Sequence, residues 1–164
     1  MKYKVIDNFL DEEYFDSLTT FFTGNGQLPW FFESDISERN IAENKLFYMF
    51  HMFYAMNIPK SPLFNNLLPL LNKLEAKCLI RIKANLYPNT EKLHEHPMHK
   101  DYDFSHTGAI LSLNTCDGYT KLKDGTKIDS IANRILLFDA SEKHSSTTTT
   151  NVLARININI NYIQ

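Results

Sequence analysis

Apolar and polar positions follow a helical period near the start of the chain. Between residues 12 and 23 the apolar side chains recur three and four positions apart, the spacing of one helix face. Asp11 is the expected N-cap, and Glu12 and Glu13 favour the positive end of the helix dipole. Gly24-Asn25-Gly26 then ends the helix. The pattern predicts an amphipathic helix that packs one face on a core.

A second helix is predicted from the leucines between residues 63 and 74, with Ser61 as its cap. Pro69 lies inside this pattern, so the helix is expected to kink or restart there. Short strand-like runs surround the two helices, at residues 3–7, 28–32 and 46–54.

After residue 97 no helical period is visible, and turn signals recur at short intervals. Asp124-Gly125, flanked by Leu122 and Ile128, is a strong hairpin signal. The strands expected in the second half are residues 77–87, 107–114, 119–123, 133–138 and 147–162.

In the last of these strands isoleucines alternate with asparagines. The apolar members are Ile156, Ile158 and Ile160, and the polar members are Asn157, Asn159 and Asn161. Arg155 shares the face of the asparagines because side chains alternate along a strand. This pattern fits a barrel with a polar, ligand-holding interior, whose isoleucines pack outward under the N-terminal helices. The fold predicted is mostly β: a jelly-roll barrel (double-stranded β-helix) buttressed by N-terminal helices.

Composition narrows the class of protein. The chain has 164 residues, 43% of them hydrophobic and 13% aromatic, which indicates one globular domain with a sizeable core. A net charge of −2 argues against nucleic-acid binding driven by bulk charge. Cys78 and Cys116 are too few for a disulfide framework. No signal peptide or membrane span is recognised, so a soluble cytoplasmic protein is expected.

Side chains that bind metals gather between residues 94 and 103. His99-x-Asp101 places an imidazole and a carboxylate on one face of an extended segment, where both can reach a single ion. His144 supplies a second imidazole much later in the chain. Two histidines and one carboxylate suit the facial triad of non-haem Fe(II) oxygenases, which leaves coordination positions open. Asp103 competes with Asp101 as the carboxylate, although the spacing favours Asp101.

An ordered set of motifs resembles the core of the 2-oxoglutarate/Fe(II)-dependent oxygenase superfamily. The likeness is to its short prolyl-4-hydroxylase-like members, including small phage-encoded ones. The motifs are His99-x-Asp101, Leu111-Ser112-Leu113-Asn114, Asp124-Gly125, Asn133 to Asp139, His144 and Ala154-Arg155-Ile156-Asn157. The resemblance covers roughly residues 78–162, and Lys4 to Leu10 also resembles how such chains begin.

The resemblance implies a site as well as a fold. His99, Asp101 and His144 would hold Fe(II), with 2-oxoglutarate as co-substrate and O2 as oxidant. Arg155 would bind the distal carboxylate of 2-oxoglutarate, because a planar guanidinium pairs with a carboxylate through two donors. Arg134 is the rival arginine and is interpreted as structural. Further co-substrate contacts are expected from Tyr87, Asn85 and Asn157.

Domain organisation and substrate are expected as follows. Residues 1–164 form one oxygenase domain, in which 1–77 supply helical support and pocket cover and 78–164 form the jelly-roll core. The loops at 33–45 and 88–97 are expected to cover the pocket. The enzyme would be a dioxygenase that hydroxylates a prolyl or other peptide residue, or a small molecule.

Two alternatives stay open at the level of the sequence. One is a jelly-roll module for binding or assembly that has no turnover. The other is a cupin-like metalloenzyme that uses His94, His96 or His99 without 2-oxoglutarate. Outside such a site, His94 and His96 are interpreted as pocket-mouth or loop side chains, His106 as a loop residue and His51 as a partly buried histidine with its polar atoms satisfied.

Overall fold

The structure is a computed structural model that describes residues 3–24, 28–34 and 46–164. Residues 25–26 of the predicted helix stop and 35–45 of the predicted loop lie outside the described residues. The elements are, in chain order, β1 (Tyr3–Ile6), α1 (Glu12–Thr23), β2 (Phe31–Glu33), β3 (Tyr48–Ala55), β4 (Ile58–Pro59), the 3-10 helix η1 (Pro62–Leu67), α2 (Leu68–Lys73), β5 (Cys78–Pro88), β6 (Thr107–Ser112), β7 (Tyr119–Leu122), β8 (Lys127–Asp129), β9 (Ile135–Asp139), β10 (His144–Ser146) and β11 (Ala154–Ile163).

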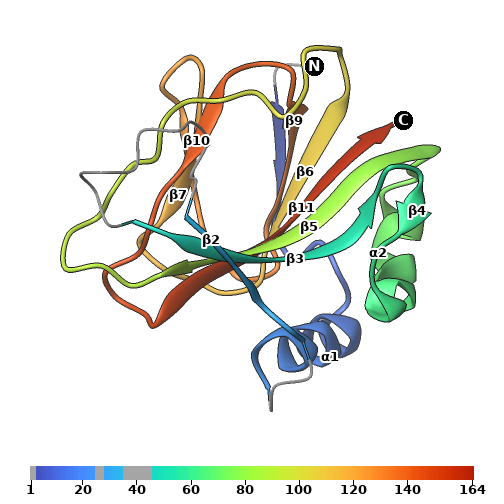
Figure 1. The fold of residues 1–164 in the computed structure, drawn as a ribbon, viewed down its shortest axis with the longest axis horizontal. Coiled ribbons are helices and arrows are strands. Elements are labelled where there is room, and N and C mark those ends of the chain that lie inside the picture. The colour runs from blue at the N-terminus through green and yellow to red at the C-terminus, as the bar shows by residue number, and fades with distance from the viewer. Residues whose placement is uncertain (1–2, 25–27, 35–45) are drawn as a thin grey trace.

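Two antiparallel sheets form the barrel. The large sheet has the strand order β1-β9-β6-β11-β5-β3-β2, and the small sheet has the order β10-β7-β8. Figure 1 shows the small sheet on one side of the long strands β5 and β11, with α1 and α2 on the other side. The predicted jelly roll buttressed by N-terminal helices is therefore confirmed.

The two faces of the large sheet have different chemistry. On the helix side, the isoleucines of β11 pack in one buried cluster with apolar side chains of α1 and α2, among them Phe15, Leu18 and Leu70. This outward packing of Ile156, Ile158 and Ile160 was predicted from their alternation and is confirmed. Facing the small sheet, a smaller apolar cluster around Ile110, Leu136 and Phe138 fills one half of the interior.

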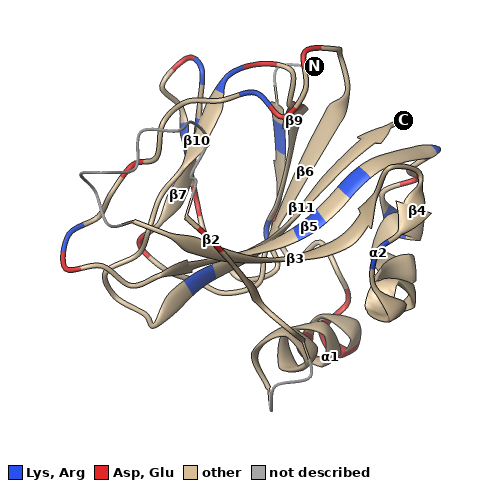
Figure 2. Cartoon of the chain, viewed as in Figure 1, with Lys and Arg blue, Asp and Glu red and all other residues tan. Residues whose placement is uncertain are grey.

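The other half of the interior is polar. Antiparallel register pairs Arg155 with Tyr87, Asn157 with Asn85, Asn159 with Lys83 and Asn161 with Arg81. Cross-strand partners point to the same face of a sheet, so β5 and β11 present a continuous polar surface to the barrel interior. Figure 2 shows basic positions along β5 and at the start of β11, two strands that carry no acidic residue.

Helix ends and turns follow their sequence signals. The Asp11 carboxylate accepts from the Tyr14 amide at 3.2 Å, and the Ser61 hydroxyl accepts from the Leu63 amide at 3.2 Å. The second helical segment changes from 3-10 to α at Leu68, next to Pro69, as the predicted restart requires. Gly125 takes a φ of 87° between β7 and β8, a conformation that costs glycine little.

In the second half of the chain, two strands begin two or more residues later than predicted. The strand expected from Thr147 starts at Ala154, because the Thr150 amide donates to the Asp117 carboxylate, which also accepts from the Thr149 and Thr150 hydroxyls. The strand expected from Asn133 starts at Ile135, because Asn133 has a φ of 60°, outside the β region. No helix in the described part of the chain is long and apolar enough to cross a membrane.

Candidate metal centre

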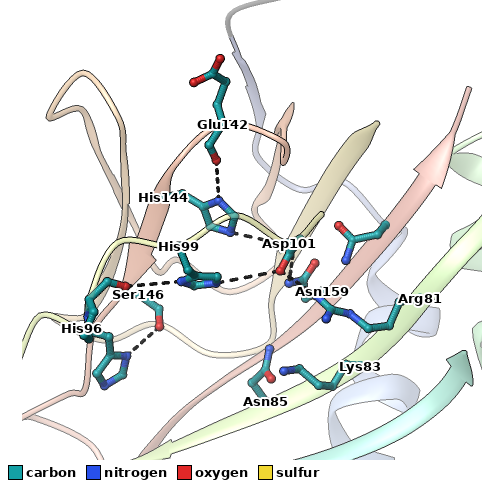
Figure 3. Close-up of polar contacts among 12 residues, drawn as sticks. Arg81, Lys83, Asn85, His96, His99, Asp101, Glu142, His144, Ser146 and Asn159 are labelled. Atoms are coloured by element: carbon teal, nitrogen blue, oxygen red, sulfur yellow. Dashed lines mark hydrogen bonds and ion pairs between the residues drawn. The ribbon is translucent and has the colours of Figure 1, made fainter. Parts of the chain in front are cut away.

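Three ligand-type side chains from distant parts of the sequence meet inside the barrel. One ligand atom each from His99, Asp101 and His144 lies within 4.8 Å of the other two. The Nε2 atoms of His99 and His144 are each 3.9 Å from a carboxylate oxygen of Asp101. Figure 3 shows the three side chains pointing toward one another. The three ligand atoms are too far apart for direct hydrogen bonds, and their separations are those of ligand atoms that surround a single cation.

The backbone brings the two imidazoles together. His99 and His144 form an isolated antiparallel bridge, with His99 N–H to His144 O and His144 N–H to His99 O both at 2.9 Å. Directly paired residues place their side chains side by side, and the two ring centroids are 4.6 Å apart. His99-x-Asp101 then puts the carboxylate on the same face, two residues further along.

Each imidazole is oriented through its second nitrogen. His144 Nδ1 lies 3.0 Å from the Glu142 carbonyl and His99 Nδ1 lies 3.4 Å from the Pro97 carbonyl. A carbonyl only accepts, so Nδ1 carries the proton and Nε2 keeps a lone pair for a ligand bond. Burial lowers the pKa of His99, which favours the neutral form that a metal requires.

Asp101 stays ionised although it is buried. Its side chain is 4% exposed, and burial by itself would raise its pKa. The Arg81 guanidinium, 2.6 Å from Oδ1, and the two imidazoles outweigh that effect and lower the pKa to about 2. Asn159 donates to Oδ2 at 3.2 Å. Asp103, the alternative carboxylate, points to solvent with its side chain 97% exposed and is not in the group.

Arg155 lies buried at the other end of the polar interior. Its Nε donates to Ser130 Oγ at 2.6 Å, Nη1 to the Thr147 carbonyl at 3.3 Å and Nη2 to Thr120 Oγ1 at 3.0 Å. A guanidinium has five N–H donors, so one donor on each terminal nitrogen is left. Among the described residues no carboxylate lies within ion-pair distance of it. A buried cation with two free donors is suited to a carboxylate that enters from solution.

A small cavity lies beside the metal group and is lined by His99, by His144 and by Thr120, whose hydroxyl accepts from Arg155. Its walls come from both sheets: Asn85, Tyr87, His99, Ile110, Thr120, His144, Ser145, Ser146, Asn157 and Asn159. The three further residues expected to contact a co-substrate are therefore on this wall. The Tyr87 ring faces the Arg155 guanidinium at 5.6 Å, and Asn85 Nδ2 donates to Asn157 Oδ1 at 3.1 Å. Asn85 Oδ1 is buried without a partner among the described residues.

Arg134 and most remaining histidines are outside this group. Arg134 pairs with Asp7 through two hydrogen bonds at 2.5 and 2.9 Å, as its structural interpretation requires. His51 bonds to the Pro29 carbonyl and the Ser61 hydroxyl, so its predicted satisfied state is confirmed. His94 is exposed, whereas His96 is buried, bonds to Ser146 Oγ at 2.8 Å and packs 5.1 Å from the Tyr87 ring.

His106 is a loop residue directly before β6, as predicted, and its side chain is buried. It is 6% exposed, and its Nε2 lies 3.1 Å from Asn161 Oδ1. The polar face of β11 continues beyond the metal group to Asn161, and His106 is the buried polar partner of that residue. The sequence around His106 gives no sign of this contact.

Sequence reasoning missed two basic residues of β5. Arg81 contacts Asp101, and Lys83 reaches the polar interior between Arg81 and Asn85. The signal was available, because Arg81, Lys83, Asn85 and Tyr87 alternate with apolar residues in the same way as the last strand.

No family model matches the chain, and no curated protein matches it. Solved structures do. A prolyl-4-hydroxylase from Pseudomonas putida matches at 13% identity with a TM-score of 0.63, over 99% of this chain and 92% of that one. A Trichoplax adhaerens prolyl hydroxylase, solved with a peptide of the hypoxia inducible factor oxygen degradation domain, matches at 16% identity with a TM-score of 0.68, over 98% of this chain and 83% of that one.

A third similar structure contains a metal ion and 2-oxoglutarate. HygX from Streptomyces hygroscopicus, with nickel and 2-oxoglutarate bound, matches at 11% identity with a TM-score of 0.63, over 98% of this chain and 82% of that one. At these identities the comparison concerns the fold. The fold of this chain is that of the 2-oxoglutarate/Fe(II) oxygenases, with prolyl-4-hydroxylase-like structures among its neighbours.

Proposed function

We propose that this protein is an Fe(II)- and 2-oxoglutarate-dependent dioxygenase that hydroxylates a substrate carbon. The observation that carries the proposal is that two features lie beside one small cavity, which is lined by His99, His144 and the Thr120 that accepts from Arg155. One is the His99, Asp101 and His144 group, and the other is the buried Arg155 guanidinium with two unused donors. Arg155 has no carboxylate partner among the described residues, so its buried charge costs folding free energy that a bound anion would offset.

The donor set fits Fe(II). Two neutral imidazoles and one carboxylate supply three ligands and leave further positions for a keto acid and dioxygen. When bound, the metal and 2-oxoglutarate would activate O2, so that substrate C–H, O2 and 2-oxoglutarate give C–OH, succinate and CO2.

The chain's own residues have separate tasks. The Glu142 and Pro97 carbonyls fix the His144 and His99 rings, and Arg81 and Asn159 orient the Asp101 carboxylate. Arg155 binds the distal carboxylate of the co-substrate, and Tyr87 covers the guanidinium from one side. Asn85 and Asn157 present amide groups to the cavity wall between the two ends. Burial of these groups excludes water from the reacting centre.

The cupin-like alternative has less support. His94 and His96 do not join the ligand group of the described residues, and such a site gives no reason for an unpaired buried arginine. The non-catalytic module is a weaker alternative for the same reason, since a module has no need of the unused Arg155 donors. We propose proline as a target by analogy with the Trichoplax prolyl hydroxylase, which was solved with a peptide.

Anaerobic titration with Fe(II) and 2-oxoglutarate tests the proposal, followed by the weak visible metal-to-ligand charge-transfer band. The native protein should form the band, and should make succinate once O2 is admitted. His99→Ala and Asp101→Ala should abolish the band, whereas Asp103→Ala, at the exposed neighbouring carboxylate, should leave it unchanged. Absence of both band and 2-oxoglutarate binding in the native protein would favour the non-catalytic module.

The wider organisation is also proposed. Residues 1–164 act as one oxygenase domain, and its location is the cytoplasm. Within it the first 77 residues supply strands β1 to β4 as well as the two helical segments, so they extend the barrel sheet in addition to supporting it.

A further inference from the structure

Lys83 is a charged residue of the barrel interior that the proposed iron and co-substrate sites do not use. It lies on the inward face of β5, opposite Asn159 on β11 and Met52 on β3. Its ammonium donates to the Tyr48 hydroxyl at 3.2 Å and lies 5.0 Å from the centroid of the Tyr48 ring and 6.0 Å from that of Phe50. The side chain is thus held against aromatic rings.

Lys83 forms no ion pair with the described residues, and only the longer-range charges of Asp101 and Glu33 favour its positive charge. Among the residues described, no carboxylate lies within ion-pair distance of its Nζ, and the nearby Asp101 is already paired with Arg81. Burial lowers the pKa of Lys83 to about 8, and the positive charge of Arg81 acts in the same direction. Confining an ammonium in this way costs free energy, which an anion beside it would offset.

Lys83 lies in the part of the barrel interior beside the metal group, away from Arg155. Along the paired strands, Asn159 and Lys83 form one register row, Asn157 and Asn85 the next, and Arg155 and Tyr87 the third. Asn159 donates to Asp101, which places the Lys83 row beside the metal group. Figure 3 shows the Lys83 side chain beside Asn85, on the side of the site where His99 and Asp101 converge. The two cations therefore cannot serve the same end of one co-substrate.

The approach to Lys83 is aromatic. Phe50 packs 6.0 Å from Phe31, whose side chain is on the edge strand β2 and is 54% exposed. Tyr48 stacks 5.7 Å from Tyr87 on the other side. An apolar or planar group can thus lie along β3 while an attached anion reaches Lys83.

We propose, as a deepening of the function proposed above, that Lys83 recognises the acceptor substrate, which carries a carboxylate or phosphate group near the carbon to be hydroxylated. The ammonium would pair with this anion and fix the distance of the target C–H from the metal. Tyr48 and Phe50 would contact the apolar part of the same molecule.

Aryl probes test this recognition by isothermal titration calorimetry under anaerobic conditions, with Fe(II) and 2-oxoglutarate present. The probes are phenylacetate, phenyl phosphate and the neutral analogue phenylacetamide. The native protein should bind one of the anions at least about tenfold more tightly than phenylacetamide, the effect of one charge-assisted hydrogen bond. The anion that binds more tightly identifies the anionic group of the acceptor substrate as a carboxylate or a phosphate.

Matched variants identify the residue. Lys83→Met should remove the preference for anions and leave 2-oxoglutarate affinity within about twofold of native, and Lys83→Arg should keep part of the preference. Lys123→Met, at an exposed lysine paired with Glu142, should bind all probes as the native protein does. Far-ultraviolet circular dichroism and the melting temperature verify that each variant is folded.

Three results would overturn the proposal: no preference for anions in the native protein, a preference that survives Lys83→Met, or a loss of 2-oxoglutarate binding in Lys83→Met as large as in Arg155→Met. The last result would assign Lys83 to the co-substrate. The charge-transfer band is recorded on the same samples before each titration. If no band forms but the Lys83-dependent preference is present, the oxygenase function fails and the anion site remains.

Discussion

Replacing Arg155 by methionine tests the co-substrate pocket most directly. The native guanidinium uses three of its five N–H donors on Ser130, Thr147 and Thr120, which leaves two for the 2-oxoglutarate carboxylate. Hydrogen bonds to charged groups contribute about 1.5–3 kcal/mol each, so the loss of two should cost about 3–6 kcal/mol of binding free energy. The dissociation constant of 2-oxoglutarate should therefore rise about 10²- to 10⁴-fold.

The same change should leave the ligand-free fold intact. Arg155 is 1% exposed and has no carboxylate partner in the described chain, so its removal relieves an uncompensated buried charge. Replacing buried charge by an apolar side chain of similar volume is often neutral or stabilising. The loss of the hydrogen bonds to Ser130, Thr147 and Thr120 acts in the opposite direction, so the free energy of unfolding without ligand should fall by about 1–3 kcal/mol at most.

Urea unfolding with and without 2-oxoglutarate, in the presence of the metal, separates the two effects. At a ligand concentration one hundred times the native dissociation constant, the native protein should gain about 2.7 kcal/mol, and a variant with hundredfold weaker affinity about 0.4 kcal/mol. Arg155→Lys, which keeps the charge without the fork, should gain an intermediate amount. Arg134→Met, at the surface pair with Asp7, is the matched control and should respond like native. Full stabilisation of Arg155→Met by 2-oxoglutarate would refute the assignment.

Three further predictions follow from the site geometry. His144→Ala should abolish the Fe(II)/2-oxoglutarate band, and a native band in that variant would remove His144 from the ligand set. Asp101 has a pKa lowered to about 2 from 3.8, so it stabilises the metal-free fold above about pH 4 and this stabilisation is lost as the pH falls toward 2. Between pH 4 and pH 2 the free energy of unfolding, measured in urea titrations, should fall by about 2 kcal/mol less in Asp101→Asn than in the native protein. Equal decreases in the two proteins would contradict this prediction. Gly118→Ala should weaken 2-oxoglutarate binding measured by calorimetry, because its Cβ would lie 2.7 Å from Arg155 Cδ and the same distance from the Thr148 carbonyl oxygen; unchanged affinity would show that Arg155 can shift freely.

The features that could be predicted from the sequence are those that depend on a short repeat of apolar and polar residues along the chain. The alternation of isoleucine and asparagine in β11 predicted an apolar outer face and a polar inner face, because side-chain direction along a strand depends on parity alone. The spacing of His99 and Asp101 predicted a shared face for the same reason, and the structure brings both next to His144. Their role as metal ligands stays a prediction, as do the co-substrate roles of Arg155, Tyr87, Asn85 and Asn157.

Contacts between distant segments could not be read in this way. Nothing local to Arg81 indicates that it faces Asp101, because that contact depends on how β5 lies beneath the segment that carries the carboxylate. The partners of Arg155 come from β7, from the residue after β8 and from the residue after β10, three separate places in the chain. The late start of β11 likewise depends on Asp117, whose carboxylate accepts the Thr150 amide that a continued strand would use in the sheet.

Because His99 and His144 are also joined through their backbones, metal binding should stabilise the contact between the two segments at the barrel opening. These two residues exchange reciprocal amide hydrogen bonds, and the same loop and three-residue strand are joined further by His96 N–H to Ser146 O and Thr148 N–H to His94 O. An ion held by both imidazoles would add a covalent-like link at that junction, so the segment before Asp101 would separate from β10 far less often. Amide hydrogens of His99 and His144 should then exchange with solvent more slowly in the loaded protein, and iron depletion would expose this edge to proteases before the remainder of the fold is affected.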